Sequence, residues 1–143
     1  GYFRAFPGVE LTASMVSNYV KKGIIGHPIK KKYTREQLAG LIYIVVSKTV
    51  LSMENIDTLF KMQRQHYSAA QAYDYFCEEV ENCLPYVFGL THTIRDLAAD
   101  AGEEKLLLRS TIIAAVNKMF LDCAFAVMHQ EQALWPDILA DLA

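Results

Sequence analysis

The chain has 143 residues, 52% of them hydrophobic and 21% charged, with 4 Pro, 7 Gly and 3 Cys. This length and composition exclude disordered, collagen-like and low-complexity chains, and they favour one compact domain or two small subdomains that share a core. The three cysteines form no Cys-x-x-Cys pair, which argues against a secreted disulfide framework. We therefore expect a cytoplasmic protein with buried thiols.

Charge is divided unevenly along the chain. Residues 1–64 carry ten basic and four acidic side chains, a formal charge of +6, whereas residues 65–143 carry four basic and twelve acidic side chains, a formal charge of −8. This asymmetry predicts an anionic partner for the basic half and a different role for the acidic half. A solvated basic face without a partner is the plain alternative.

Helical spacing of the apolar residues predicts an all-α chain. The first helix is expected over residues 12–22, where Thr12 or Ser14 can cap the start and Gly23 can end the helix in a left-handed conformation. Residues 23–33 contain Gly and Pro and are too few for another helix, which fits a short two-stranded wing or an extended loop.

Two further helices complete the basic half. Thr34 and Gln37 have the T-x-x-Q form of a capping box, which predicts a helix that ends near residue 48. Ser52 is placed to cap the next helix, in which apolar residues follow at helical spacing. The basic half is therefore predicted to be helix, basic wing, helix, helix.

The acidic half is predicted to be a helical bundle. Its three longer helices and one short terminal helix are expected at residues 67–82, 86–101, 103–130 and 137–142. Pro85, Gly102 and Pro136 mark the expected breaks between them.

The most apolar stretch of the chain is residues 106–128. It contains Arg109, Lys118 and Asp122, whose charges would be costly in the hydrocarbon core of a bilayer. We expect a helix buried in a bundle or a dimer there, and no membrane contact.

A polar row on the first predicted helix points to nucleic acid. Four hydrogen-bonding side chains recur at i, i+3, i+4 and i+7, away from the apolar stripe: Ser14, Ser17, Asn18 and Lys21. An Asn amide can pair with adenine, and a Lys can reach guanine or a phosphate. The basic segment that follows can neutralise phosphates, and it completes the predicted DNA-binding set with Lys22, Lys30, Lys31, Lys32, Tyr33 and Arg35.

Three segments of the basic half follow one another in a recognisable order. Residues 15–25 read Met-Val-Ser-Asn-Tyr-Val-Lys-Lys-Gly-Ile-Ile, residues 30–38 read Lys-Lys-Lys-Tyr-Thr-Arg-Glu-Gln-Leu after Pro28, and residues 51–56 read Leu-Ser-Met-Glu-Asn-Ile. They resemble the MerR-type winged helix-turn-helix over about residues 14–59, and are most similar to a bacterial family of uncharacterised MerR-like proteins. The resemblance implies a transcriptional regulator that binds double-stranded DNA.

The sequence departs from the MerR pattern in three respects. Ser17 stands where that family usually has an Arg in the middle of the recognition helix. No helix is evident in residues 1–11 to precede the recognition helix, and we expect it in residues before Gly1. The C-terminal half is also expected to lack the single long coiled-coil helix of typical MerR dimers.

Nothing in the sequence predicts an enzyme, a cofactor or a metal site. The histidines are scattered without a Ser or Cys partner arrangement, and no Gly-rich phosphate loop is present. Cys77, Cys83 and His92 have spacings of six and nine residues, which match no standard metal site.

The prediction is thus a MerR-like DNA-binding region over residues 1–64 and an acidic bundle over residues 65–143 that dimerises or senses a signal. We expect a homodimer through the C-terminal helices, because palindromic DNA needs two copies. Two alternatives stay open. One is a protein–protein interaction module that binds no DNA. The other is a sensor that binds a small-molecule effector between the aromatic side chains of the acidic half.

Overall fold

The computed structural model describes residues 12–30, 32–97 and 102–142, with side chains as far as Gln130. In these ranges the chain forms five helices and no strand: α1 (Ala13–Lys21), α2 (Arg35–Ser47), α3 (Met53–His66), α4 (Ala69–Val87) and α5 (Glu103–Leu142). The predicted all-α class is confirmed. The predictions for residues 1–11 lie outside the described residues.

Side-chain caps fix where the first helices begin. The Thr12 side chain accepts a hydrogen bond from the Met15 N–H at 3.2 Å, and Ser52 caps α3 in the same way. The predicted capping box of α2 is present, since the Thr34 hydroxyl and the Gln37 amide each accept a backbone N–H of the other residue. Each cap supplies an acceptor for an N–H group that the helix itself leaves unpaired.

The predicted break at Pro85 is wrong, because α4 continues through this residue to Val87. Proline lacks the N–H that would bond to the carbonyl four residues earlier, but so near the helix end only one backbone hydrogen bond is lost. Gly89 then adopts a left-handed φ of 77°, and the Leu90 N–H donates to the Pro85 carbonyl at 2.8 Å. The stop signal is therefore the glycine that follows the proline.

The helix predicted over residues 86–101 does not form in the described part of that range. Residues 88–97 are a loop that lies along α4, and the Asn82 side chain pairs with the backbone N–H and carbonyl of Arg95 at 2.9 and 2.7 Å. Asp96 also forms an ion pair with Arg109 of α5 at 2.8 Å. The Asn82 side chain thus satisfies two backbone groups of this loop, and the Asp96–Arg109 ion pair joins the loop to α5.

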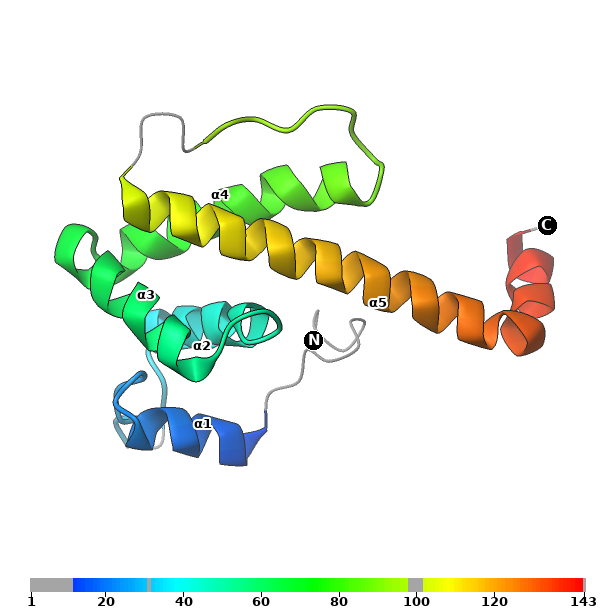
Figure 1. Cartoon of the computed structure of the whole chain (residues 1–143). Helices are drawn as coiled ribbons and strands as arrows, with labels where there is room; N and C mark the ends of the chain where they lie inside the picture. The colour runs from blue at the N-terminus through cyan, green and yellow to red at the C-terminus, as the bar shows by residue number, and fades with distance from the viewer. Residues whose placement is uncertain (1–11, 31, 98–101, 143) are drawn as a thin grey trace.

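The C-terminal segment is one helix, so the predicted separation into residues 103–130 and 137–142 is wrong. α5 has 40 residues, and its ribbon changes direction near the C-terminal end (Figure 1). The C-terminal half therefore does contain a single long helix, contrary to the expectation, and whether α5 forms a coiled coil as in typical MerR dimers stays a prediction. Pro136 removes one backbone N–H, which a helix tolerates as a bend.

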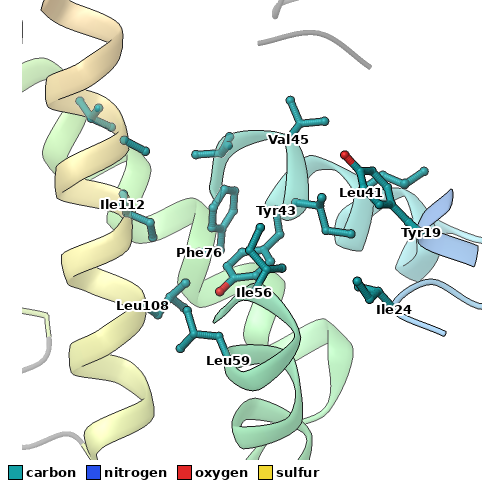
Figure 2. Close-up of a cluster of buried hydrophobic side chains, with 14 of the residues drawn as sticks. Tyr19, Ile24, Leu41, Tyr43, Val45, Ile56, Leu59, Phe76, Leu108 and Ile112 are labelled. Carbon is teal, nitrogen blue, oxygen red and sulfur yellow. The ribbon is translucent and has the colours of Figure 1, made fainter. Parts of the chain in front are cut away.

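One hydrophobic core joins the helices of the basic half to α4 and α5. Figure 2 shows Tyr43 of α2 and Phe76 of α4 near its centre, with Ile112 of α5 on one side and Tyr19 of α1 on the other. The Tyr43 ring packs edge-on against Phe60 and Phe76, with centroids 4.9 and 5.6 Å apart. This core fixes the position of α1 relative to the acidic half.

Candidate nucleic-acid interface

α1 divides into a buried face and an exposed polar face. Tyr19 is 3% exposed and packs in the core together with the half-buried Met15 and Val16. The polar row predicted from the sequence is exposed at all four of its positions: Ser14, Ser17, Asn18 and Lys21. The structure thus brings these four side chains together on one side of a single short helix.

The turn after α1 holds the helix against α2. Gly23 has a φ of 73°, and the Ile24 and Ile25 N–H groups then donate to the Tyr19 carbonyl at 3.0 and 3.4 Å. Both isoleucines are buried. A Cβ built on Gly40 of α2 would lie 2.9 Å from Ile25 Cδ1, so a larger residue there would make the end of the Ile25 side chain shift.

The basic segment forms a tight turn with a single β-bridge. The N–H groups of Ile29 and Lys32 each donate to the carbonyl of the other residue, at 3.0 and 2.9 Å. Lys30 has a φ of 50°, in the left-handed region that two-residue hairpin turns use. Lys30 and Lys32 are exposed, and the predicted site residue Lys31 lies outside the described residues.

Two residues anchor this turn. Tyr33, one of the predicted site residues, is half-buried and packs against the core. It therefore anchors the turn, unlike the exposed lysines. The Gln37 amide nitrogen donates to the carbonyls of Gly26 and His27 at 3.2 and 3.1 Å. The sequence indicated Gln37 only as a capping residue, because its second role depends on a contact across ten or eleven residues.

Cations dominate this region. Residues 11–35 contain six Lys or Arg and no acidic residue. The exposed members within the described residues are Lys21, Lys22, Lys30, Lys32 and Arg35, which we call the basic surface. The ion pairs found among the described residues lie elsewhere, at Asp57–Lys61, Asp96–Arg109 and Lys118–Asp122. The basic surface is therefore free to attract an anionic partner.

A buried carboxylate in α4 was missed by the sequence analysis. Glu79 is fully buried, and its Oε1 accepts a hydrogen bond from the Tyr75 hydroxyl at 2.7 Å, while Oε2 has no partner among the described residues. Burial, and then this hydrogen bond, raise the pKa of Tyr75. Burial also raises the pKa of the nearby Cys83 thiol, which makes that thiol a poor nucleophile. Buried polar groups in one helix leave no periodic signal in a sequence.

α5 presents a second exposed surface, which is apolar. Its first half carries the buried side chains Leu108, Ile112 and Val116, but farther along the helix apolar side chains are exposed. We call this group the α5 apolar stripe, and its members are Phe120, Leu121, Phe125, Val127 and Met128. By length and composition alone, Glu103–Gln130 is also long and apolar enough to cross a membrane.

The three residues considered as metal ligands lie on two different elements. Cys77 and Cys83 lie on α4, whereas His92 is exposed in the following loop. Within residues 12–30, 32–97 and 102–130, no three or more His, Cys, Asp or Glu side chains are grouped so that they could hold a metal ion.

Comparison with known proteins yields one match. Residues 3–76 match the family described as Domain of unknown function (DUF1836), and this stretch contains α1, α2, α3 and the basic surface. No curated protein and no solved structure matches the chain significantly. Because the match spans just over half of the 143 residues, the chain belongs to the DUF1836 family.

Proposed function

We propose that this protein binds duplex DNA through α1 and the basic surface and acts as a transcriptional regulator. The observation that carries the proposal is the exposed polar row on α1 beside a basic turn. Residues 11–35, which include both, contain no acidic residue. Double-stranded DNA offers both partners that such a surface needs, a dense line of phosphates and base edges with hydrogen-bonding groups.

The dimensions of α1 suit this role. A helix with its side chains is about 10–12 Å in diameter and the major groove is about 12 Å wide, so α1 can enter it. Asn18 and Lys21 then face the base edges, while Lys22 and Arg35 lie on either side of the turn and contact phosphates. In this arrangement the base contacts set sequence preference, and the phosphate contacts set most of the affinity.

The conformation of Lys30 supports a role for its charge. A residue with a side chain costs about 1–2 kcal/mol in the left-handed region, whereas glycine adopts it freely. A lysine at this position therefore costs stability and extends a cation from the tight turn. Strain of this kind is found mainly at functional sites.

The arrangement α1, basic turn, α2 corresponds to the recognition helix, wing and next helix of the MerR-type winged helix-turn-helix. The turn would serve as a minimal wing, since Ile29 and Lys32 pair through one bridge. This correspondence supports DNA as the partner.

The active form is proposed to be a homodimer through the α5 apolar stripe. Exposed apolar groups that lie together on a surface usually mark an interaction site. α5 also extends beyond the end of α4 (Figure 1), so a second copy could reach the stripe without displacing the core. Two copies would present two α1 helices to a palindromic site.

Fluorescence anisotropy tests the proposal directly. The full chain is titrated onto labelled random duplex DNA and onto duplex DNA from upstream of its own gene, at low and at near-physiological salt. We expect binding that weakens with salt, with a log–log slope of about −0.9 for each phosphate contact, and that favours the upstream DNA.

Three variants separate the roles. Asn18→Ala should reduce the preference for upstream over random DNA, whereas Lys32→Gln should weaken binding to both and reduce the salt slope by about 0.9. Lys118→Gln on α5 is the matched control, because it removes an exposed lysine far from the basic surface, and it should change neither. A folded wild-type protein that binds no duplex at low salt would refute the proposal.

A further inference from the structure

A cleft lies between the turn after α1 and the three helices that follow. Its volume is about 320 Å³, and Ile24, Ile25 and Gly26 of the turn form one wall. α2, α3, α4 and the residues between α3 and α4 supply most of the other walls, which include five aromatic rings: Tyr43, Phe60, Tyr67, Tyr73 and Phe76. An apolar cavity of roughly 150 Å³ can hold a benzene molecule, so this cleft has room for one or two fused rings.

A guanidinium group makes the aromatic cleft electrostatically suited to an anion. Arg64 of α3 lines it, with its Cζ 5.7 Å from the centroid of the Phe60 ring. Glu36 is the acidic residue among the lining side chains and is exposed.

A buried polar group without a well-formed hydrogen bond lies in the same wall. Gln63 is 7% exposed, and its amide nitrogen has no hydrogen-bond acceptor of good geometry among the described residues. The neighbouring Tyr43 hydroxyl is equally unsatisfied, and burial raises its pKa to about 12 even though the nearby Ser47 and Gln63 side chains lower it. Buried donors are normally satisfied, so this wall can accept an additional oxygen atom.

We propose that this cleft binds a small aromatic carboxylate, with its ring between the aromatic side chains and its carboxylate at Arg64. A guanidinium can hold a carboxylate by two parallel hydrogen bonds, and aromatic walls favour a planar ring. The Gln63 side chain lines the same cleft as a second polar group. A neutral ligand of the same shape would lack the attraction to Arg64.

Occupation of the cleft would also act on α1. Ile24, Ile25 and Gly26 follow α1 directly, and a ligand packed against them would hold α1 more firmly on α2 and α3. Regulation of DNA affinity by the ligand follows from this coupling. Only this last step rests on the proposed function, because binding to the cleft requires no DNA.

The first experiment measures ligand binding without DNA. Benzoate and 1-naphthoate are titrated into the full chain by calorimetry and by NMR chemical-shift mapping, with benzamide and 1-naphthamide as neutral controls of the same shape. We expect saturable binding of at least one acid, tighter by about ten-fold than that of its amide, and chemical-shift changes that are largest at the cleft residues.

Three variants locate the site. Arg64→Gln should remove the preference for acid over amide. Ala39→Leu places a larger side chain in the cleft, and it should weaken the binding of both the acid and the amide by about ten-fold or more. Lys61→Gln removes another exposed cation of α3 that does not line the cleft, and it should change nothing. Absence of saturable binding of either acid to folded wild-type protein at millimolar concentration, or equal binding to wild type and to Arg64→Gln, overturns the proposal.

The same ligands are then added to the anisotropy assay. Ligand binding together with a shift in DNA affinity supports both proposals and their coupling. Ligand binding by a protein that binds no duplex would leave the cleft assignment standing and refute the DNA proposal. DNA binding by a protein that binds neither acid would refute the cleft assignment and leave the DNA proposal standing.

Discussion

The basic surface around α1 and the α5 apolar stripe are both exposed, but the free-energy cost of exposure to water differs between them. Lysine and arginine head groups are well hydrated, so exposure of the basic surface costs little free energy. Burying a side chain such as Phe125 or Met128 is favourable by roughly 1.5–3 kcal/mol. The α5 stripe therefore points to a partner on energetic grounds alone, whereas a partner for the basic surface is inferred from its chemistry and pattern.

The largest expected effect comes from placing charge on the α5 stripe. In Phe125→Glu/Met128→Glu, two carboxylates would enter the proposed dimer interface, and we expect dimerisation to weaken by about 100-fold or more, since each lost burial is worth roughly 1.5–3 kcal/mol. Light scattering coupled to size-exclusion chromatography measures the mass. Gln130→Glu is the control, because Gln130 is exposed on the same helix and lies on the side away from the stripe.

Two results would contradict the proposed dimer through the α5 apolar stripe. A wild-type protein that is monomeric at high micromolar concentration would remove the second copy as the partner. A wild-type chain that sediments with membranes and needs detergent for release would instead make α5 a membrane segment, in line with its length and composition.

The next effect concerns a buried hydrogen bond within α4. Tyr75→Phe removes the hydroxyl that donates to Glu79, and it leaves a fully buried carboxylate with no partner among the described residues. We expect a loss of about 1–3 kcal/mol in the free energy of unfolding, measured in urea. Tyr86→Phe changes an exposed tyrosine of the same helix and should cost much less. Equal losses in the two variants would show that the buried hydrogen bond is unimportant.

At Lys30, stability and function should change in opposite directions. Lys30→Gly relieves the left-handed strain, and we expect the free energy of unfolding to rise by up to about 1 kcal/mol. The same change removes a cation from the basic surface, so DNA affinity should fall and the salt slope should decrease by about 0.9. A stabilised variant with unchanged DNA affinity would separate the turn from the proposed interface.

The smallest effect is a pH dependence at the start of α5. The backbone N–H at the helix start, and then the Tyr67 hydroxyl at 3.0 Å, lower the pKa of Glu104 from its ordinary value of 4.5. A carboxyl with a lowered folded-state pKa stabilises the fold above the unfolded value, and this contribution disappears as the pH falls through the folded value. Glu104→Gln should therefore flatten the loss of stability below about pH 4.5. Urea unfolding from pH 7 to pH 3 measures it, and an unchanged profile would contradict the assignment.

Local chemistry was enough to predict much of the basic half. The caps at Thr12, Thr34 and Ser52 each act within three residues, so their sequence patterns already determine where the helices begin. The polar row of α1 follows from helical periodicity alone, and all four of its side chains are exposed. These features depend on neighbours in the chain and need no knowledge of the rest of the fold.

Only the tertiary structure decided the features that depend on distant partners. Pro85 is tolerated because α4 ends two residues later, and residues 88–97 stay extended because Asn82 pairs with the Arg95 backbone. The second role of Gln37, the burial of Glu79 and the cleft arise where separate helices meet. Sequence alone determined which side chains share a helix face. Packing decided which faces are covered and which stay exposed, because burial depends on what other parts of the chain bring into contact.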